Sequence, residues 1–71
     1  MMGRLRNGSY EFLKSLIGKT KEEGVELCKN NDYSVRIVRV DSNRYILTMD
    51  LRFDRVNFEL DNGIITKCDI Y

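Results

Sequence analysis

The clearest pattern in the chain is a strict alternation of apolar and polar residues over 56–60. Its apolar members are Val56, Phe58 and Leu60. A period of two places these side chains on one face of a strand, so the segment is predicted to be a strand with one buried face. The tripeptide Asp61-Asn62-Gly63 that follows indicates a hairpin, because Asn-Gly tolerates positive φ. A returning strand is therefore predicted over 64–69.

A helix is predicted to begin at Thr20. Thr20 and Glu23 form a capping box, in which each side chain accepts a hydrogen bond from a backbone amide that the first helical turn leaves unpaired. The polar run Asn30-Asn31-Asp32 ends the helix. Gly24 lies on the same face as Leu27 and Cys28. Because a mid-helix glycine costs about 1 kcal/mol relative to alanine, we expect Gly24 to mark a close approach between helix and sheet.

The remaining segments complete a small α+β arrangement. Residues 33–40 are rich in β-branched side chains and predict a strand, 41–44 a turn, and 10–17 an irregular or short helical lead-in. The order of elements predicts a single helix packed on a small mixed β-sheet, with an extended exposed loop. The predicted core contains Gly24 and the side chains of Leu27, Cys28, Ile37, Val56, Phe58 and Ile64.

The predicted loop precedes the alternating strand. Residues 48–55 intersperse Met49, Leu51 and Phe53 with charged side chains that could brace one another. We interpret this segment as a presented loop that is anchored at both ends by strands.

Composition limits the function more by exclusion than by direct indication. The chain has 71 residues with 42% apolar content, which suits one domain over 10–71 after a flexible N-terminal arm over 1–9. A net charge of +1 argues against a nucleic-acid surface, and no apolar run is long enough to span a membrane. Because no signal peptide is visible, we expect a cytoplasmic protein or a mature or recombinant form of a secreted one.

The absence of histidine bears on catalysis and metal binding. Without histidine the chain has no conventional Ser-His or Cys-His nucleophile pair and none of the usual zinc ligand sets. We therefore expect no enzyme activity, no metal site and no cofactor. Cys28 and Cys68 could form a disulfide, although the fold does not need one.

The chain resembles the potato inhibitor I family of serine-protease inhibitors, which includes the barley chymotrypsin inhibitor, eglin and bacterial-type relatives. The resemblance extends over about Leu13 to Cys68. The residues that carry it are Leu16-Ile17-Gly18-Lys19-Thr20, Val35-Arg36-Ile37-Val38 and Thr48-Met49-Asp50-Leu51-Arg52-Phe53-Asp54-Arg55-Val56.

This resemblance implies a substrate-like inhibitor with a reactive bond between Met49 and Asp50. It implies that Met49 is the primary specificity residue, and an unbranched apolar thioether suits subtilisin-like and chymotrypsin-like pockets. A monomer that binds such a protease is expected. Residues expected to contact the protease beside the reactive bond are Leu47, Thr48, Leu51 and Arg52.

Two further residues are expected to brace the loop. Arg55 is expected to bridge the Thr48 hydroxyl, the Asp50 carboxylate and backbone carbonyls with its planar guanidinium. Asn57 stands where plant and leech members carry a second arginine, and bacterial-type relatives also have asparagine there.

Two other functions stay open. The same fold could serve as a non-inhibitory protein-binding module that docks through its loop or sheet edge, or as a structural, oligomer-forming domain. Four further arginines are expected to lie on a solvated surface: Arg36, Arg39, Arg44 and Arg52.

Overall fold

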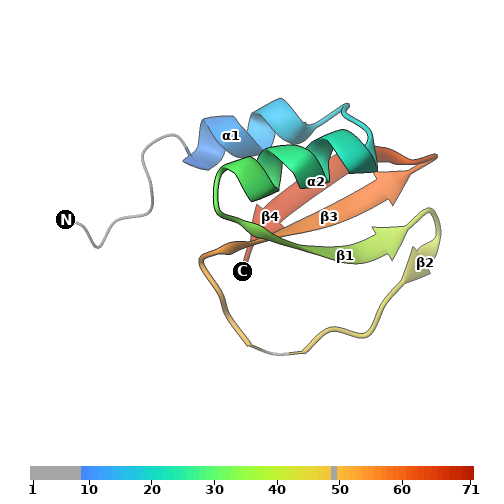
Figure 1. Ribbon diagram of the computed structural model, residues 1–71. Helices are drawn as coiled ribbons and strands as arrows, with labels where there is room; N and C mark the ends of the chain where they lie inside the picture. Colours follow the sequence, from blue (N-terminus) through green and yellow to red (C-terminus); the bar gives the residue numbers. More distant parts are fainter. Residues whose placement is uncertain (1–8, 49) are drawn as a thin grey trace.

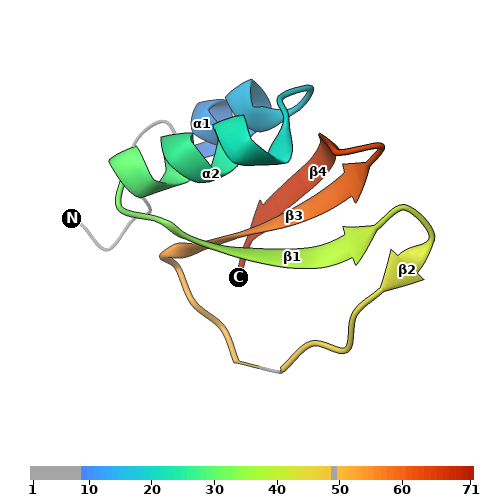
Figure 2. The ribbon, with the colours of Figure 1, turned by 45° about the vertical axis from the view of Figure 1, so that its right-hand side comes forward.

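A computed structural model describes residues 9–48 and 50–71. The predicted arm over 1–9 lies outside the described residues except for Ser9, where the first helix begins. In chain order the elements are α1 (Ser9–Leu16), α2 (Lys21–Asn30), β1 (Ser34–Val40), β2 (Asn43–Arg44), β3 (Arg55–Asp61) and β4 (Ile64–Ile70). Both helices lie on one side of the sheet, and the long connection from β2 to β3 passes round the other side (Figures 1 and 2).

The four strands form one mixed sheet in the order β2-β1-β3-β4. The central pair, β1 and β3, is parallel, while β1–β2 and β3–β4 are antiparallel. In the central register Val35 is paired with Val56, Arg36 with Asn57 and Ile37 with Phe58. The fold is therefore α+β with a mixed sheet, as predicted.

The predicted helix start and hairpin turn are confirmed. At the start of α2 the Thr20 amide donates to Glu23 Oε1 at 3.0 Å and the Glu23 amide donates to Thr20 Oγ1 at 3.2 Å. Hydrogen bonds from the backbone amide and the side chain of Thr20 lower the pKa of the Glu23 carboxyl. In the β3–β4 turn, Asn62 and Gly63 have φ values of 54° and 77°. Two consecutive positive φ values match the twist of a tight hairpin, which explains the Asn-Gly pair.

The prediction of a single helix is wrong, because the lead-in forms helix α1. Leu16 is fully buried, and the ring of Phe12 stacks on Tyr33 with centroids 5.2 Å apart. An eight-residue helix is too short to be stable alone, so packing against the core rather than local propensity holds it. The apolar residues of 10–17 indicate this packing, and the short helical form is one of the two alternatives predicted for the segment.

The core lies between the helices and the sheet. Its buried members are Leu16, Cys28, Tyr33, Val56, Phe58, Leu60 and Ile65, with Leu27 and Ile37 packed at its margin. Ile64 is not among them, so its predicted core place is wrong. The β3–β4 register shifts between Glu59 and Leu60, so that Leu60 pairs with Ile65, whereas the unshifted register would pair it with Thr66. The shift puts Ile65 rather than Ile64 on the core face of β4. Gly24 lies directly against Ile65 and Phe58, which confirms a close approach of helix and sheet at this position.

Strand β3 is buried on both faces. Val56, Phe58 and Leu60 face the helices, while Arg55, Asn57 and Glu59 alternate with them and are also buried. The register puts Arg36 and Arg39 of β1 beside Asn57 and Glu59. We call the surface formed by Arg36, Arg39, Arg55, Asn57 and Glu59 the polar face of the sheet.

Candidate functional site

The connection between β2 and β3, residues 45–54, is the candidate site and is called the connecting loop below. It has neither helix nor strand among its described residues. Main-chain hydrogen bonds fix both ends to β1: the Tyr45 amide donates to the Val38 carbonyl at 3.1 Å, and the Ser34 amide donates to the Asp54 carbonyl at 2.7 Å. The loop therefore spans most of the length of β1.

The connecting loop exposes large apolar side chains. Ile46 is fully exposed, and Leu51 and Phe53 are 74% and 70% exposed. Leu47 is half-buried and Thr48 is exposed, whereas Met49 lies outside the described residues. Apolar side chains presented along an irregular segment are suited to binding a protein partner.

Arg55, the first residue of β3, contacts the loop directly. Its Nη1 donates to Asp50 Oδ2 at 3.2 Å and its Nη2 donates to the Asp50 carbonyl at 3.3 Å. Its Nε donates to the Tyr71 carbonyl at 3.1 Å. Because Arg55 is only 7% exposed, its guanidinium is held against the sheet as well as against the loop. One buried side chain thus holds both the carboxylate and the backbone of Asp50.

Asp50 is charged under all ordinary conditions. The Thr48 hydroxyl donates to Asp50 Oδ1, and this bond together with Arg55 lowers the pKa of Asp50 to about 2. Hydrogen bonds to the ionised form favour that form, so the carboxylate remains an acceptor well below neutral pH. Thr48 and Asp50 are therefore locked to each other across the position of Met49.

Asn57 is part of the same arrangement but does not touch the loop through any described contact. It is almost completely buried, its Nδ2 donates to the Tyr71 carbonyl at 3.4 Å, and its Oδ1 accepts from Arg36 Nε at 2.8 Å. Arg36 Nη1 in turn donates to Thr48 Oγ1 at 3.2 Å. Asn57 thus orients an arginine of the neighbouring strand.

Arg36 is a further contact of the connecting loop, and it is not among the loop-bracing residues predicted from the sequence. The expectation that Arg55 bridges Thr48 does not match the contacts described, in which Arg36 is the arginine on the Thr48 hydroxyl. The expectation of a solvated Arg36 is also wrong, since its side chain is 18% exposed. The alternation of β1 contains the signal: Val35 and Ile37 face the core, so Arg36 faces the loop.

Arg39 forms a second cluster on the polar face. Its Nε donates to Glu59 Oε1 at 2.8 Å, and its two terminal nitrogens donate to Asp61 at 2.9 and 2.7 Å. Arg44 reaches Glu59 at 3.5 Å from β2. These bonds join β1, β2 and β3 beside the start of the loop, so Arg39 is structural rather than a solvated side chain as expected.

Arg52 and Asp54 pair with each other rather than with the sheet. The guanidinium donates two bonds of 3.0 Å to the carboxylate, which raises the pKa of Arg52 and lowers that of Asp54. Both side chains are about half exposed. Exposed pairs of this kind contribute little to stability, so the pair shapes the loop without anchoring it.

Other chemistry is sparse in the described part of the chain. Cys28 and Cys68 are free thiols, and burial raises the pKa of each to about 11. The described residues contain no metal-binding group of three or more His, Cys, Asp or Glu side chains. Neither described helix has the length and apolar character needed to cross a bilayer.

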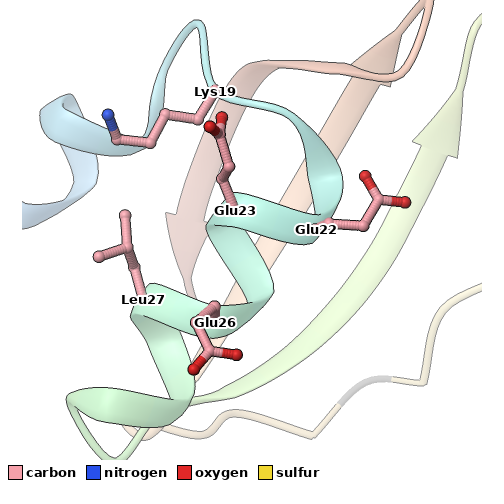
Figure 3. Close-up of a pocket in the computed structure, with 5 residues that line it drawn as sticks. All are labelled: Lys19, Glu22, Glu23, Glu26 and Leu27. Carbon is pink, nitrogen blue, oxygen red and sulfur yellow. The ribbon is translucent and has the colours of Figure 1, made fainter.

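An open groove of about 540 Å³ lies along α2, on the helix side of the sheet (Figure 3). It is lined by Lys19, Glu22, Glu23, Glu26 and Leu27. Glu23 is occupied by the capping box, and the other acids lie on the exposed surface of the helix. The groove is therefore a charged helix surface, remote in sequence from the connecting loop.

Comparison of the chain with protein-family models and with curated protein sequences finds no match. The residues that converge on the connecting loop thus provide the basis for a functional inference. The loop exposes apolar side chains, and its Thr48 and Asp50 are held from the sheet by Arg36 and Arg55.

Proposed function

We propose that the protein is a substrate-like serine-protease inhibitor, with the connecting loop as the binding segment and Met49–Asp50 as the reactive bond. The partner is a subtilisin-like or chymotrypsin-like protease. The observation that carries the proposal is the double hold of Arg55 on Asp50, through the carboxylate and the carbonyl. It secures the residue directly after the reactive bond.

The energetic case concerns loop entropy. Fixing a backbone residue costs roughly 1–2 kcal/mol, so a mobile six-residue segment would lose about 6–12 kcal/mol on binding. A loop held by main-chain bonds at Tyr45 and Asp54 and by side chains at Thr48 and Asp50 has met much of that cost beforehand. Prior ordering of this kind favours an inhibitor over an ordinary substrate.

The exposed side chains support the choice of partner. A protease binds its substrate as an extended segment and reads side chains on both sides of the scissile bond. Ile46 precedes the proposed bond and Leu51 and Phe53 follow it, and all three are available to a partner. The resemblance of residues 48–56 to the reactive segment of potato inhibitor I proteins points to the same bond.

The test is titration of the purified protein against subtilisin and chymotrypsin, with residual activity and mass spectrometry as readouts. We expect stoichiometric inhibition, slow cleavage after Met49, and loss of inhibition in Met49→Gly. Tyr10→Ala is the matched control, because Tyr10 is an exposed apolar residue of α1 outside the loop. It should inhibit like the unmodified protein.

Two results would count against the proposal. Rapid cutting after Met49 would mean that the loop is presented as a substrate. No inhibition with an uncut chain would leave the fold as a non-inhibitory protein-binding module.

A further inference from the structure

Arg36 reaches the connecting loop from a different strand than Arg55. It lies on β1, directly beside Asn57 in the parallel register. Its Nε donates to Asn57 Oδ1 at 2.8 Å, and its guanidinium carbon lies 5.5 Å from the centre of the Tyr71 ring. These contacts fix the guanidinium on the polar face and leave Nη1 directed at Thr48.

The hydrogen bonds between Arg36 and Arg55 form one chain that converges on Asp50 from both ends. Arg36 Nη1 donates to the Thr48 hydroxyl, the hydroxyl donates to Asp50, and Arg55 Nη1 donates to the other oxygen of Asp50. A guanidinium can only donate, and a hydroxyl has a single proton. Once its oxygen accepts from Arg36, that proton is directed to Asp50. Arg36 therefore sets the orientation of the Thr48 hydroxyl.

We propose that Arg36 is a positioning residue that acts through Thr48, and that β1 and β3 hold opposite sides of the Met49–Asp50 bond. Arg36 secures the Thr48 side and Arg55 secures the Asp50 side. The inhibitory consequence rests on the proposed function, whereas the ordering of Thr48 by Arg36 does not depend on it.

The consequence concerns what happens after cleavage. Hydrolysis adds one water to the amide and leaves a carboxylate on Met49 and an ammonium group on Asp50, and resynthesis releases that water. If each new end is held by its own strand, the two stay at high effective concentration and resynthesis competes with release. Two separate anchors achieve this, whereas a single anchor leaves one end free.

A second observation argues that Arg36 serves more than stability. Its Nη2 is buried and has no hydrogen-bond partner among the described residues. A buried donor without a partner carries a desolvation penalty, so a side chain selected for stability alone would avoid it. The penalty is understandable if the guanidinium is required at this place for the loop.

The first test uses the free protein and no protease. Backbone ¹⁵N relaxation measures order parameters at Leu47 and Thr48 on one side and at Asp50 and Leu51 on the other. We expect Arg36→Met to lower the order parameters of Leu47 and Thr48 from about 0.85 toward about 0.6. The order parameters of Asp50 and Leu51 should change less. Arg55→Met should give the reverse. A general loss of structure would lower the order parameters equally on both sides of the Met49–Asp50 bond.

Two further variants guard the test against a folding defect. Thr48→Val removes the hydroxyl at an exposed position, and it should reproduce the effect of Arg36→Met. At Leu47 and Thr48 the double variant should show no larger effect than Thr48→Val alone, because the bond from Arg36 to the hydroxyl is already lost in that variant. Arg36 Nη1 also lies 4.0 Å from Asp50 Oδ1, and loss of that ion pair bears on the Asp50 side. Arg36→Lys should restore part of the order, since an ammonium can donate to Thr48 but lacks the planar fork that also engages Asn57.

The second test uses subtilisin and measures the ratio of cleaved to intact chain at equilibrium. Without the Arg36 anchor the new Met49 end moves more freely in the cleaved chain and its effective concentration falls, so we expect this ratio to rise roughly tenfold in Arg36→Met. An unchanged order parameter at Thr48 in Arg36→Met and Thr48→Val would overturn the assignment. If the unmodified protein inhibits no protease, the proposed function fails, and the relaxation data still decide the role of Arg36.

Discussion

Gly24 offers a quantitative test of how α2 packs on the sheet. A Cβ at this position would lie 2.4 Å from Ile65 Cδ1 and 3.0 Å from two ring carbons of Phe58. Carbon atoms pack best at about 3.5–4.0 Å, so the neighbours must move by roughly 1 Å. Ile65 and Phe58 are both fully buried, which leaves little room for that movement.

The expected size of the effect follows from two opposing terms. Overpacking a core costs about 1–3 kcal/mol, and replacing a mid-helix glycine with alanine gains about 1 kcal/mol. With two rigidly packed neighbours we expect Gly24→Ala to lower the free energy of unfolding by about 1–2 kcal/mol. Urea denaturation followed by circular dichroism measures it.

Ile65→Val tests the cause, because it removes the Cδ1 atom that the new Cβ would meet. This change alone should cost about 0.5–1.5 kcal/mol. In the Ile65→Val background, Gly24→Ala should leave the free energy of unfolding nearly unchanged. The two substitutions would then have a coupling energy of about 1 kcal/mol or more. Glu26→Gly and Glu26→Ala, at an exposed position of α2, measure the intrinsic difference between the two residues. Equal costs of Gly24→Ala in both backgrounds would refute the packing argument.

Three other changes separate the core from the loop. Phe58→Ala should cost about 3–5 kcal/mol in urea denaturation, because Phe58 is fully buried in the core; a loss below about 1 kcal/mol would contradict that placement. Arg55→Met should speed cleavage after Met49 by subtilisin at least roughly tenfold, through loss of its charged hydrogen bonds, and unchanged cleavage would remove Arg55 from the bracing role. The pKa of Asp50 is lowered from 3.8 to about 2. Its contribution to loop order should therefore be complete above about pH 4 and be lost as the pH falls through 2. An NMR titration of its carboxyl carbon with a midpoint at or above 3.8 would refute this.

The parts of the fold that follow from the sequence are those that neighbouring residues determine. Thr20 and Glu23 cap α2, and the turn residues Asn62 and Gly63 close the hairpin, through contacts within a few positions. Ile65 takes the place predicted for Ile64 because a register shift between strands decides it. That shift depends on a partner strand, which local alternation does not reveal.

The candidate site shows the same limit. Asp50 and Arg55 are five positions apart, and it was the resemblance to potato inhibitor I proteins that associated them. Arg36 and Thr48 are twelve positions apart, and they meet only because β1 and β3 pair in parallel with Arg36 beside Asn57. Alternation along β1 places Arg36 on the face opposite the core, but its partners depend on that register.

The parallel pairing of β1 with β3 has a practical consequence for any sample of this protein. A cut after Met49 divides the chain into one peptide with α1, α2, β1 and β2 and a second with β3 and β4. No disulfide joins the two, since both cysteines are free. Val56, Phe58 and Leu60 of the shorter peptide are nevertheless buried against the longer one. Separation would expose the whole core, so the cut protein should elute from a sizing column as one particle and show two bands only after denaturation.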